Sequence, residues 1–133
     1  MSTLQIVKTD QITVWVHVEK KIIHHQMHQF TSGETLQNAL MAGIAGMKKY
    51  RAYKWLSDDR KNPVISPEDQ QWTASVWRPL AIQSGWKYWA IVIPETTLNQ
   101  IRMKKIAETN SKLGVTVEFF HDPQKAMEWL EKQ

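Results

Sequence analysis

The sequence predicts an α/β fold: a mixed sheet, mostly parallel, with an antiparallel N-terminal hairpin and about four helices. In the first third of the chain, Ile12, Val14 and Val16 alternate with Thr13 and other residues at a period of two, which is typical of a strand. Farther on, short apolar segments alternate with segments of helical spacing, and this favours parallel crossovers. Because the 133 residues contain no linker or internal repeat, we expect a single domain over 1–133.

The strands follow from short apolar or alternating segments. A charged turn at Glu19–Lys21 is expected to join two of them into an antiparallel hairpin. The consecutive apolar residues of 87–93 are typical of a strand covered on both faces. We expect strands at 4–8, 12–18, 22–30, 52–57, 87–93 and 115–120, and a last helix after Asp122-Pro123.

The first helix is predicted by its start and by its apolar spacing. Thr31 and Glu34 have the spacing of a capping box, in which a hydroxyl and a carboxylate satisfy each other's free amides. Apolar residues then recur at helical spacing to about Tyr50. Gly43 and Gly46 predict close approach to the sheet, since a helical Gly otherwise costs about 1 kcal/mol relative to Ala.

Two further helices have recognisable starts or interruptions. Ser66, followed by a proline and two acidic residues, predicts a capped helix start. Pro79 should kink or shorten this helix, because proline removes one hydrogen bond of the ladder. In the helical region 94–113 the apolar phase slips between Ile101 and Met103, so we expect a break there.

The composition excludes several classes of protein. Without cysteine there is no disulfide scaffold, thiolate metal site or cysteine nucleophile. The net charge of +4 is modest, and we expect the basic clusters at 48–54 and 102–105 to end or cover helices, so no nucleic-acid partner is predicted. The longest apolar run, Tyr88–Ile93, is far shorter than the roughly 20 residues that span a bilayer. No signal peptide is readable, and we expect a cytoplasmic protein that is not integral to a membrane.

Three neighbouring histidines, His24, His25 and His28, invite a metal hypothesis. In a strand, neighbours point to opposite faces and residues four apart are separated by about 13 Å, so these three cannot share one ion. His17 on the neighbouring strand could approach one of them. We therefore expect no metal and no other cofactor, with the histidines exposed or hydrogen-bonded on the sheet.

The chain contains no recognisable catalytic motif. It has no Gly-x-Ser-x-Gly elbow and no glycine-rich phosphate loop. Asp58 and Asp59 are adjacent carboxylates, but consecutive residues normally diverge and more often serve loops or helix caps. We therefore expect no catalytic residues.

A candidate rim for a ligand or a partner lies at the carboxyl ends of the strands, where open parallel sheets bind ligands. Helix N-termini point to the same rim and favour anions. Each residue there also has an ordinary role as a cap or turn former. The rim residues are Thr31, Ser32, Asp58, Asp59, Arg60, Ser66, Glu95, Thr96 and His121.

Seven tryptophans are many for a chain of this length. Trp72 and Trp77 are five apart on the predicted second helix, so we expect them to face different sides. Most tryptophans should fill the core with the indole N–H satisfied, and an exposed one suits a dimer contact. Together with the exposed edge of the N-terminal hairpin, this predicts a homodimer.

Four strings of residues resemble bacterial SpoIIAA-like proteins of the STAS superfamily. They are Lys54–Arg60, Val64–Trp72, Ala90–Pro94 and Phe119–Leu130. The resemblance implies an α/β fold related to CRAL-TRIO lipid-binding domains. Anti-sigma-factor antagonists of this superfamily are phosphorylated on a serine in an Asp-Ser-Ser-Gly-type turn at the start of the second helix. Ser66 has a comparable place without that motif, so we expect a structural cap rather than a switch.

Taken with the resemblance, these patterns favour a non-catalytic domain that binds a protein or a small ligand, with a regulatory role. The alternative, implied by the CRAL-TRIO relation and the apolar helices, is a domain that binds a lipid or another apolar ligand. A third hypothesis is that the chain is a small enzyme whose catalysis uses Asp58, Arg60 and His121.

Overall fold

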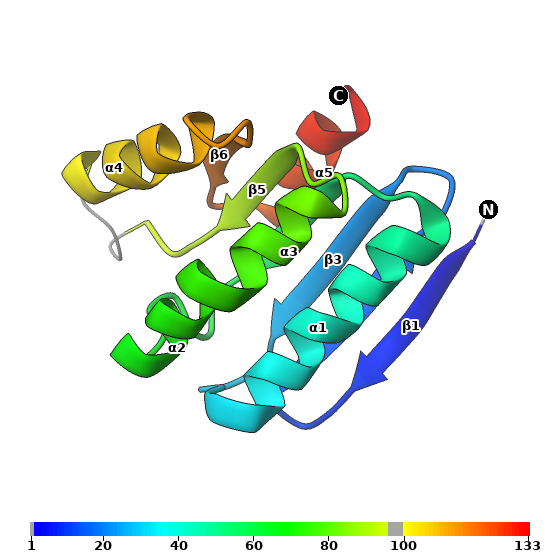
Figure 1. Cartoon of the computed structure of the whole chain (residues 1–133), viewed down its shortest axis with the longest axis horizontal. Helices are drawn as coiled ribbons and strands as arrows, with labels where there is room; N and C mark the ends of the chain where they lie inside the picture. Colours follow the sequence, from blue (N-terminus) through cyan, green and yellow to red (C-terminus); the bar gives the residue numbers. More distant parts are fainter. Residues whose placement is uncertain (1, 96–99) are drawn as a thin grey trace.

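The computed structural model describes residues 2–95 and 100–133. Its strands are β1 (Thr3–Lys8), β2 (Ile12–His17), β3 (Ile22–Met27), β4 (Lys54–Asp58), β5 (Tyr88–Val92) and β6 (Thr116–Phe120). In this part of the chain they form one six-stranded sheet in sequence order, with β1 and β6 at its edges (Figure 1). β1, β2 and β3 pair antiparallel, whereas β3 to β6 pair parallel. The predicted fold class, including the N-terminal hairpin, is therefore confirmed.

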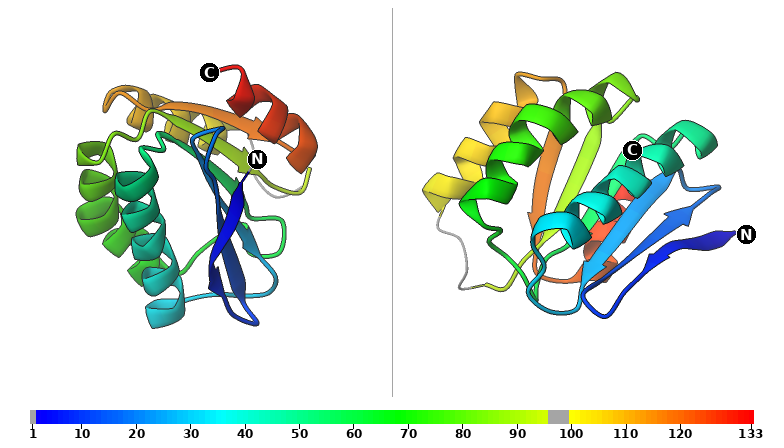
Figure 2. Two further views of the ribbon diagram at one scale, coloured as in Figure 1. Left: turned by 90° about the vertical axis from the view of Figure 1, so that its right-hand side faces the viewer. Right: turned by 60° about the horizontal axis from the view of Figure 1, so that its bottom comes forward.

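Helices cover both faces of this sheet. They are α1 (Gly33–Tyr50), α2 (Pro67–Trp72), the π-helical turn η1 (Thr73–Trp77), α3 (Arg78–Gln83), α4 (Gln100–Ser111) and α5 (Pro123–Glu131). α2, η1 and α3 are continuous, so the described helices form four segments, as predicted. α1 to α4 lie on one face and α5 on the other (Figure 2). No described helix has both the length and the apolar character needed to cross a membrane.

The parallel strands are buried on both faces because helices cover both. On β4, Trp55 packs in the cluster under α1, whereas Leu56 packs in the cluster under α5. On β5, Ala90 and Val92 belong to the α5 cluster and are completely buried. This two-sided burial explains the consecutive apolar residues of the strand and confirms its prediction.

The start of α1 differs from the predicted capping box. The Thr31 hydroxyl donates to the carbonyl of Gln29 at 2.9 Å, and Ser32, the N-cap residue, makes no side-chain cap bond. The N–H of Gly33 instead donates to both carboxylate oxygens of Asp69, each at 3.2 Å. The capping box is therefore wrong, because a buried carboxylate from the neighbouring helix α2 takes its place.

Two glycines of α1 allow the helix to approach the sheet, as predicted. A Cβ at Gly43 would lie 2.7 Å from Cζ3 of the Trp55 ring. At Gly46 it would lie 3.1 Å from Val16 Cγ2 and 3.2 Å from Ile23 Cδ1. The Trp55 ring thus occupies the space that a larger residue would need at Gly43.

Pro79 changes the helical pitch rather than ending the helix. The N–H of Arg78 donates to the carbonyl of Thr73, five residues back, which defines the π turn η1. This wider turn brings residues five apart to one side, and both Trp72 and Trp77 pack in the core cluster under α1. The expectation that these two tryptophans face different sides is therefore wrong.

The predicted break between Ile101 and Met103 is also wrong. α4 runs without interruption from Gln100 to Ser111, and Ile101 is 79% exposed. The apolar spacing of the sequence is interrupted there because Ile101 lies on the solvent-exposed side of the helix. Strand ends differ by a few residues, since β3 stops at Met27 rather than Phe30 and β4 starts at Lys54 rather than Ala52.

Candidate functional site: a tryptophan-lined cavity

A cavity of about 480 Å³ lies between the sheet and helices α2, α3 and α4; we call it the helix-side cavity. Its floor includes a row of register partners that crosses four parallel strands. Because successive side chains of a strand point to opposite faces, residues in register on parallel strands share one face. The row consists of His25, Ser57, Ile91 and Phe119.

Four tryptophans line the helix-side cavity. Neighbouring rings in the series have centroids 5.0, 5.1 and 5.3 Å apart. Each indole N–H already has an acceptor, so the rings are held in place and present apolar surface. The four are Trp55, Trp77, Trp86 and Trp89, and their acceptors are His25 Nδ1, the Leu40 and Tyr88 carbonyls, and Ser57 Oγ, in that order.

A chain of hydrogen bonds fixes the tautomer of His25. Trp55 Nε1 donates to His25 Nδ1 at 2.9 Å, and an indole N–H can only donate. Nδ1 must therefore be unprotonated, so the ring proton lies on Nε2 and is donated to Asp59 Oδ1 at 2.7 Å. Both ring nitrogens are thus engaged.

The helix-side cavity is lined by a serine, a histidine and an aspartate, the residue types of a hydrolytic triad. They are Ser57, His25 and Asp59. Their arrangement differs from a triad. A catalytic histidine holds the carboxylate with one nitrogen and the nucleophile with the other. Here the second nitrogen of His25 accepts from Trp55, and Ser57 Oγ accepts from Trp89. Both His25 nitrogens thus have partners other than the Ser57 hydroxyl.

Of the rim residues at the end of β4, which are Asp58, Asp59 and Arg60, only Asp59 lines the helix-side cavity. Asp58 is buried and binds Arg60 through two hydrogen bonds of 2.8 Å. These bonds, with the charge of Asp58, raise the pKa of Arg60 above its usual value. Asp58 and Arg60 therefore form an ion pair with each other and do not line the cavity with Asp59.

The rim residues at the starts of α1 and α2 have structural contacts. The carbonyl of Thr31 accepts from the buried Asn62 amide at 3.0 Å. Ser66 Oγ accepts from the N–H of Asp69 at 3.2 Å, which confirms the predicted cap. The Ser66 hydroxyl also bonds to Asp69 Oδ2 at 2.9 Å. None of Thr31, Ser32 and Ser66 lines the helix-side cavity.

The rim residues Glu95 and His121 follow β5 and β6. His121 Nδ1 donates to the carbonyl of Ile93 at 2.9 Å, which links the ends of the two strands. Glu95 is exposed, and Thr96 lies outside the described residues. Among the described rim residues, only Asp59 lines the helix-side cavity, and a ligand or partner site at the rim stays a prediction. Alternation within Ile22–Met27 places His25 on the core face with Ile23, and this signal could have identified it from the sequence.

The other histidines have separate partners. His24 Nδ1 and His17 Nε2 are 3.1 Å apart, on the face away from the helix-side cavity, as the alternation requires. His28 Nε2 bonds to Thr13 Oγ1 at 2.7 Å. Burial, with the charges of His17 and His25, lowers the pKa of His24 to about 3. Within 2–95 and 100–133, no three histidines or carboxylates are grouped as metal ligands.

Comparisons with models of protein families, with curated proteins and with solved structures found no match for this chain. The geometry of the cavity is therefore the basis for a functional proposal.

Proposed function

We propose that this chain is a non-catalytic domain that binds a small apolar ligand in the helix-side cavity. The observation that carries the proposal is the cavity of about 480 Å³ with its four tryptophans. Ligand pockets commonly measure about 300–1,000 Å³ and have apolar, aromatic walls with a few polar groups. Of the two expected classes of partner, a protein or a small ligand, the cavity favours the small ligand.

The polar groups of the cavity support binding rather than catalysis. Trp55 and Asp59 engage both nitrogens of His25, so this ring is poorly placed to move a proton. Fixed polar groups of this kind orient a ligand among apolar walls. A lipid, the alternative ligand, could occupy the same apolar cavity, and ligand binding there is compatible with a regulatory role.

Fluorescence titration with N-phenylnaphthylamine tests the proposal, because this uncharged aromatic dye becomes bright in an apolar site. Ala74 lines the cavity, and Ala74→Trp should fill it and abolish dye binding. The neighbouring Val76 is 42% exposed and does not line the cavity, so Val76→Trp is the matched control. Absence of binding to the wild type, or equal loss in both variants, would refute the proposal.

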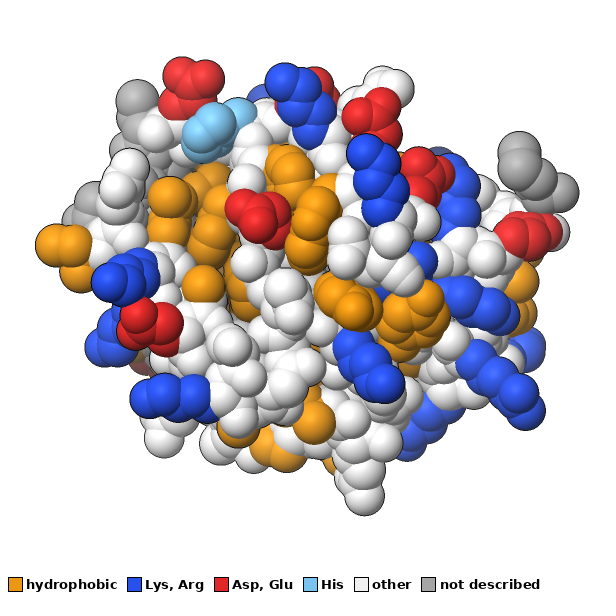
Figure 3. Space-filling model, turned by 90° about the horizontal axis from the view of Figure 1, so that it is seen from above, with side chains coloured by type: hydrophobic (Ala, Val, Ile, Leu, Met, Phe, Trp, Pro, Cys, Tyr) orange, Lys and Arg blue, Asp and Glu red, His pale blue; other side chains and the backbone are white. Residues whose placement is uncertain are grey.

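The homodimer stays a prediction, as do the cytoplasmic location and the resemblance to SpoIIAA-like proteins. Among the described strands, β6 has a free edge as well as β1. Hydrophobic side chains gather on the face seen in Figure 3, which looks onto α4, β6 and α5. Free edges and apolar surface are common at subunit contacts, and sedimentation at several concentrations measures whether two chains associate.

A further inference from the structure

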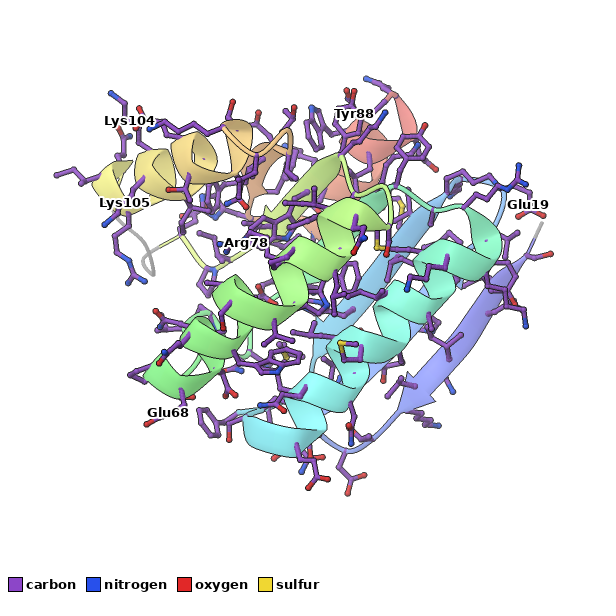
Figure 4. The ribbon with its side chains drawn as sticks, viewed as in Figure 1. Glu19, Glu68, Arg78, Tyr88, Lys104 and Lys105 are labelled. Atoms are coloured by element: carbon purple, nitrogen blue, oxygen red, sulfur yellow. The ribbon has the colours of Figure 1, made fainter. Side chains whose placement is uncertain are left out.

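Arg78 reaches the helix-side cavity from an irregular helix. It is the first residue of α3 and directly follows the π turn η1. Short π-helical insertions are frequent at functional sites, because they re-aim the side chains around them. Figure 4 shows Arg78 in the space between α3 and α4, and its side chain lines the cavity.

The guanidinium of Arg78 has no partner within the part of the chain that the structure describes. Its Nε is buried without a hydrogen-bond acceptor. No carboxylate of the described residues forms an ion pair with it. Burial lowers the pKa of Arg78 below its usual value, since the charged form loses hydration. Arg78 is half-buried, and a buried donor such as its Nε destabilises a fold when it has no acceptor, so an external partner would explain its place.

The other charged groups of the cavity make its surroundings positive. Lys105 and Arg102 line it from α4, and Arg78 lines it from α3. The carboxylate of Asp59 faces it from the end of β4, and its Oδ1 accepts the proton of His25. An anion at Arg78 therefore meets more positive than negative charge.

We infer that the ligand of the helix-side cavity carries an acidic group and that Arg78 binds this group, an inference that rests on the proposed function. The ligand is thus a compact amphipathic anion: an apolar or aromatic body with a carboxylate, sulfonate or phosphate. Trp77, next to Arg78, provides apolar wall beside the charge. Arginine suits this role because its planar fork of donors matches the oxygens of such groups.

Two dyes that differ mainly in one sulfonate test the inference. Anilinonaphthalene sulfonate is the acidic counterpart of the uncharged N-phenylnaphthylamine. The wild type should bind the acidic dye roughly tenfold or more tightly than the neutral one, as a charge-assisted hydrogen bond in a desolvated site allows. Arg78→Gln should remove this preference, measured as the ratio of the two affinities, whereas Arg78→Lys should retain part of it.

Lys104→Gln is the control for simple loss of positive charge. Lys104 lies on α4, its side chain is 78% exposed, and it does not line the cavity. Its variant should therefore keep the full preference for the acidic dye. Denaturant unfolding of each variant establishes that it is folded before dyes are compared.

The outcomes separate the inference from the proposed function. Binding of both dyes without preference in the wild type, or a preference that survives Arg78→Gln, overturns the role of Arg78 and leaves the apolar site standing. Failure of the neutral dye to bind the wild type overturns the proposed function itself, and the inference with it.

Discussion

Replacing Gly43 by alanine should destabilise the protein, whereas the same change at Gly46 should not. A Cβ at Gly43 would lie 2.7 Å from Trp55 Cζ3 and closer still to Cη2. Trp55 cannot turn away freely, because its indole N–H is bonded to His25. The ring also packs edge-on against Trp77, with centroids 5.0 Å apart. The substitution therefore forces α1 away from the sheet or distorts the wall of the cavity.

The magnitude follows from two opposing effects. Overpacking a dense core costs about 1–3 kcal/mol, and Gly→Ala inside a helix recovers about 1 kcal/mol. The atoms that obstruct Gly43 belong to a buried ring, so we expect the upper end of the cost and a net loss of about 2 kcal/mol. Gly46 faces the ends of Val16 and Ile23 at 3.1 and 3.2 Å, which can shift. The net change there should be about 0 kcal/mol.

Urea unfolding followed by tryptophan fluorescence measures both variants against the wild type. Gly43→Ala should lower the midpoint without changing the slope, because the unfolded surface is the same. It should also weaken binding of N-phenylnaphthylamine, since Trp55 lines the cavity. Equal stability of Gly43→Ala and Gly46→Ala would refute the reasoning that the Trp55 ring fixes the distance between α1 and the sheet.

Three further predictions concern charge and capping. Burial, with the charges of His17 and His25, lowers the pKa of His24 from 6.5 to about 3, so the folded state binds fewer protons than the unfolded chain. The unfolding free energy therefore reaches its full value above about pH 6.5 and falls by about 1.4 kcal/mol per pH unit below it. In His24→Gln, the unfolding free energy should fall less between pH 7 and pH 5 than in the wild type. An equal fall in both proteins would contradict this prediction. Arg78→Met should raise the unfolding free energy of the ligand-free protein by about 1 kcal/mol, because it removes the buried Nε donor that has no acceptor. A loss of stability in urea would show that the guanidinium has a structural partner. Ser66→Ala should lower the unfolding free energy by about 1 kcal/mol through loss of the helix cap. If protein phosphorylated on Ser66 is recovered from cells, and if this phosphorylation releases a bound partner, Ser66 is a regulatory switch instead.

Features that depend on nearby residues could be predicted from the sequence. Alternation defined the strands of the hairpin, since a side-chain period of two needs only neighbouring residues. The caps at Ser66 and Asp122 were predictable because the hydroxyl and the carboxylate bond to amides two or three residues ahead. The small residues of α1 indicated a close contact with the sheet, although not that Trp55 makes it.

The candidate site depended on the tertiary structure. Gly33 is capped by Asp69, 36 positions away, and no local pattern could show that α2 ends up beside the start of α1. The rim was predicted from the ends of strands, and of its residues that the structure describes only Asp59 lines the cavity.

The sequence by itself determined the order of strands and helices, because hydrogen bonding and apolar periodicity act over a few residues. The cavity was decided by packing. His25, Trp55 and Arg78 come from three separate segments, and only the register of the parallel strands and the π turn before Pro79 place them around one space. Side-chain burial and charge pairing depend on which segments become neighbours, and that choice minimises the free energy of the whole chain rather than of any one segment.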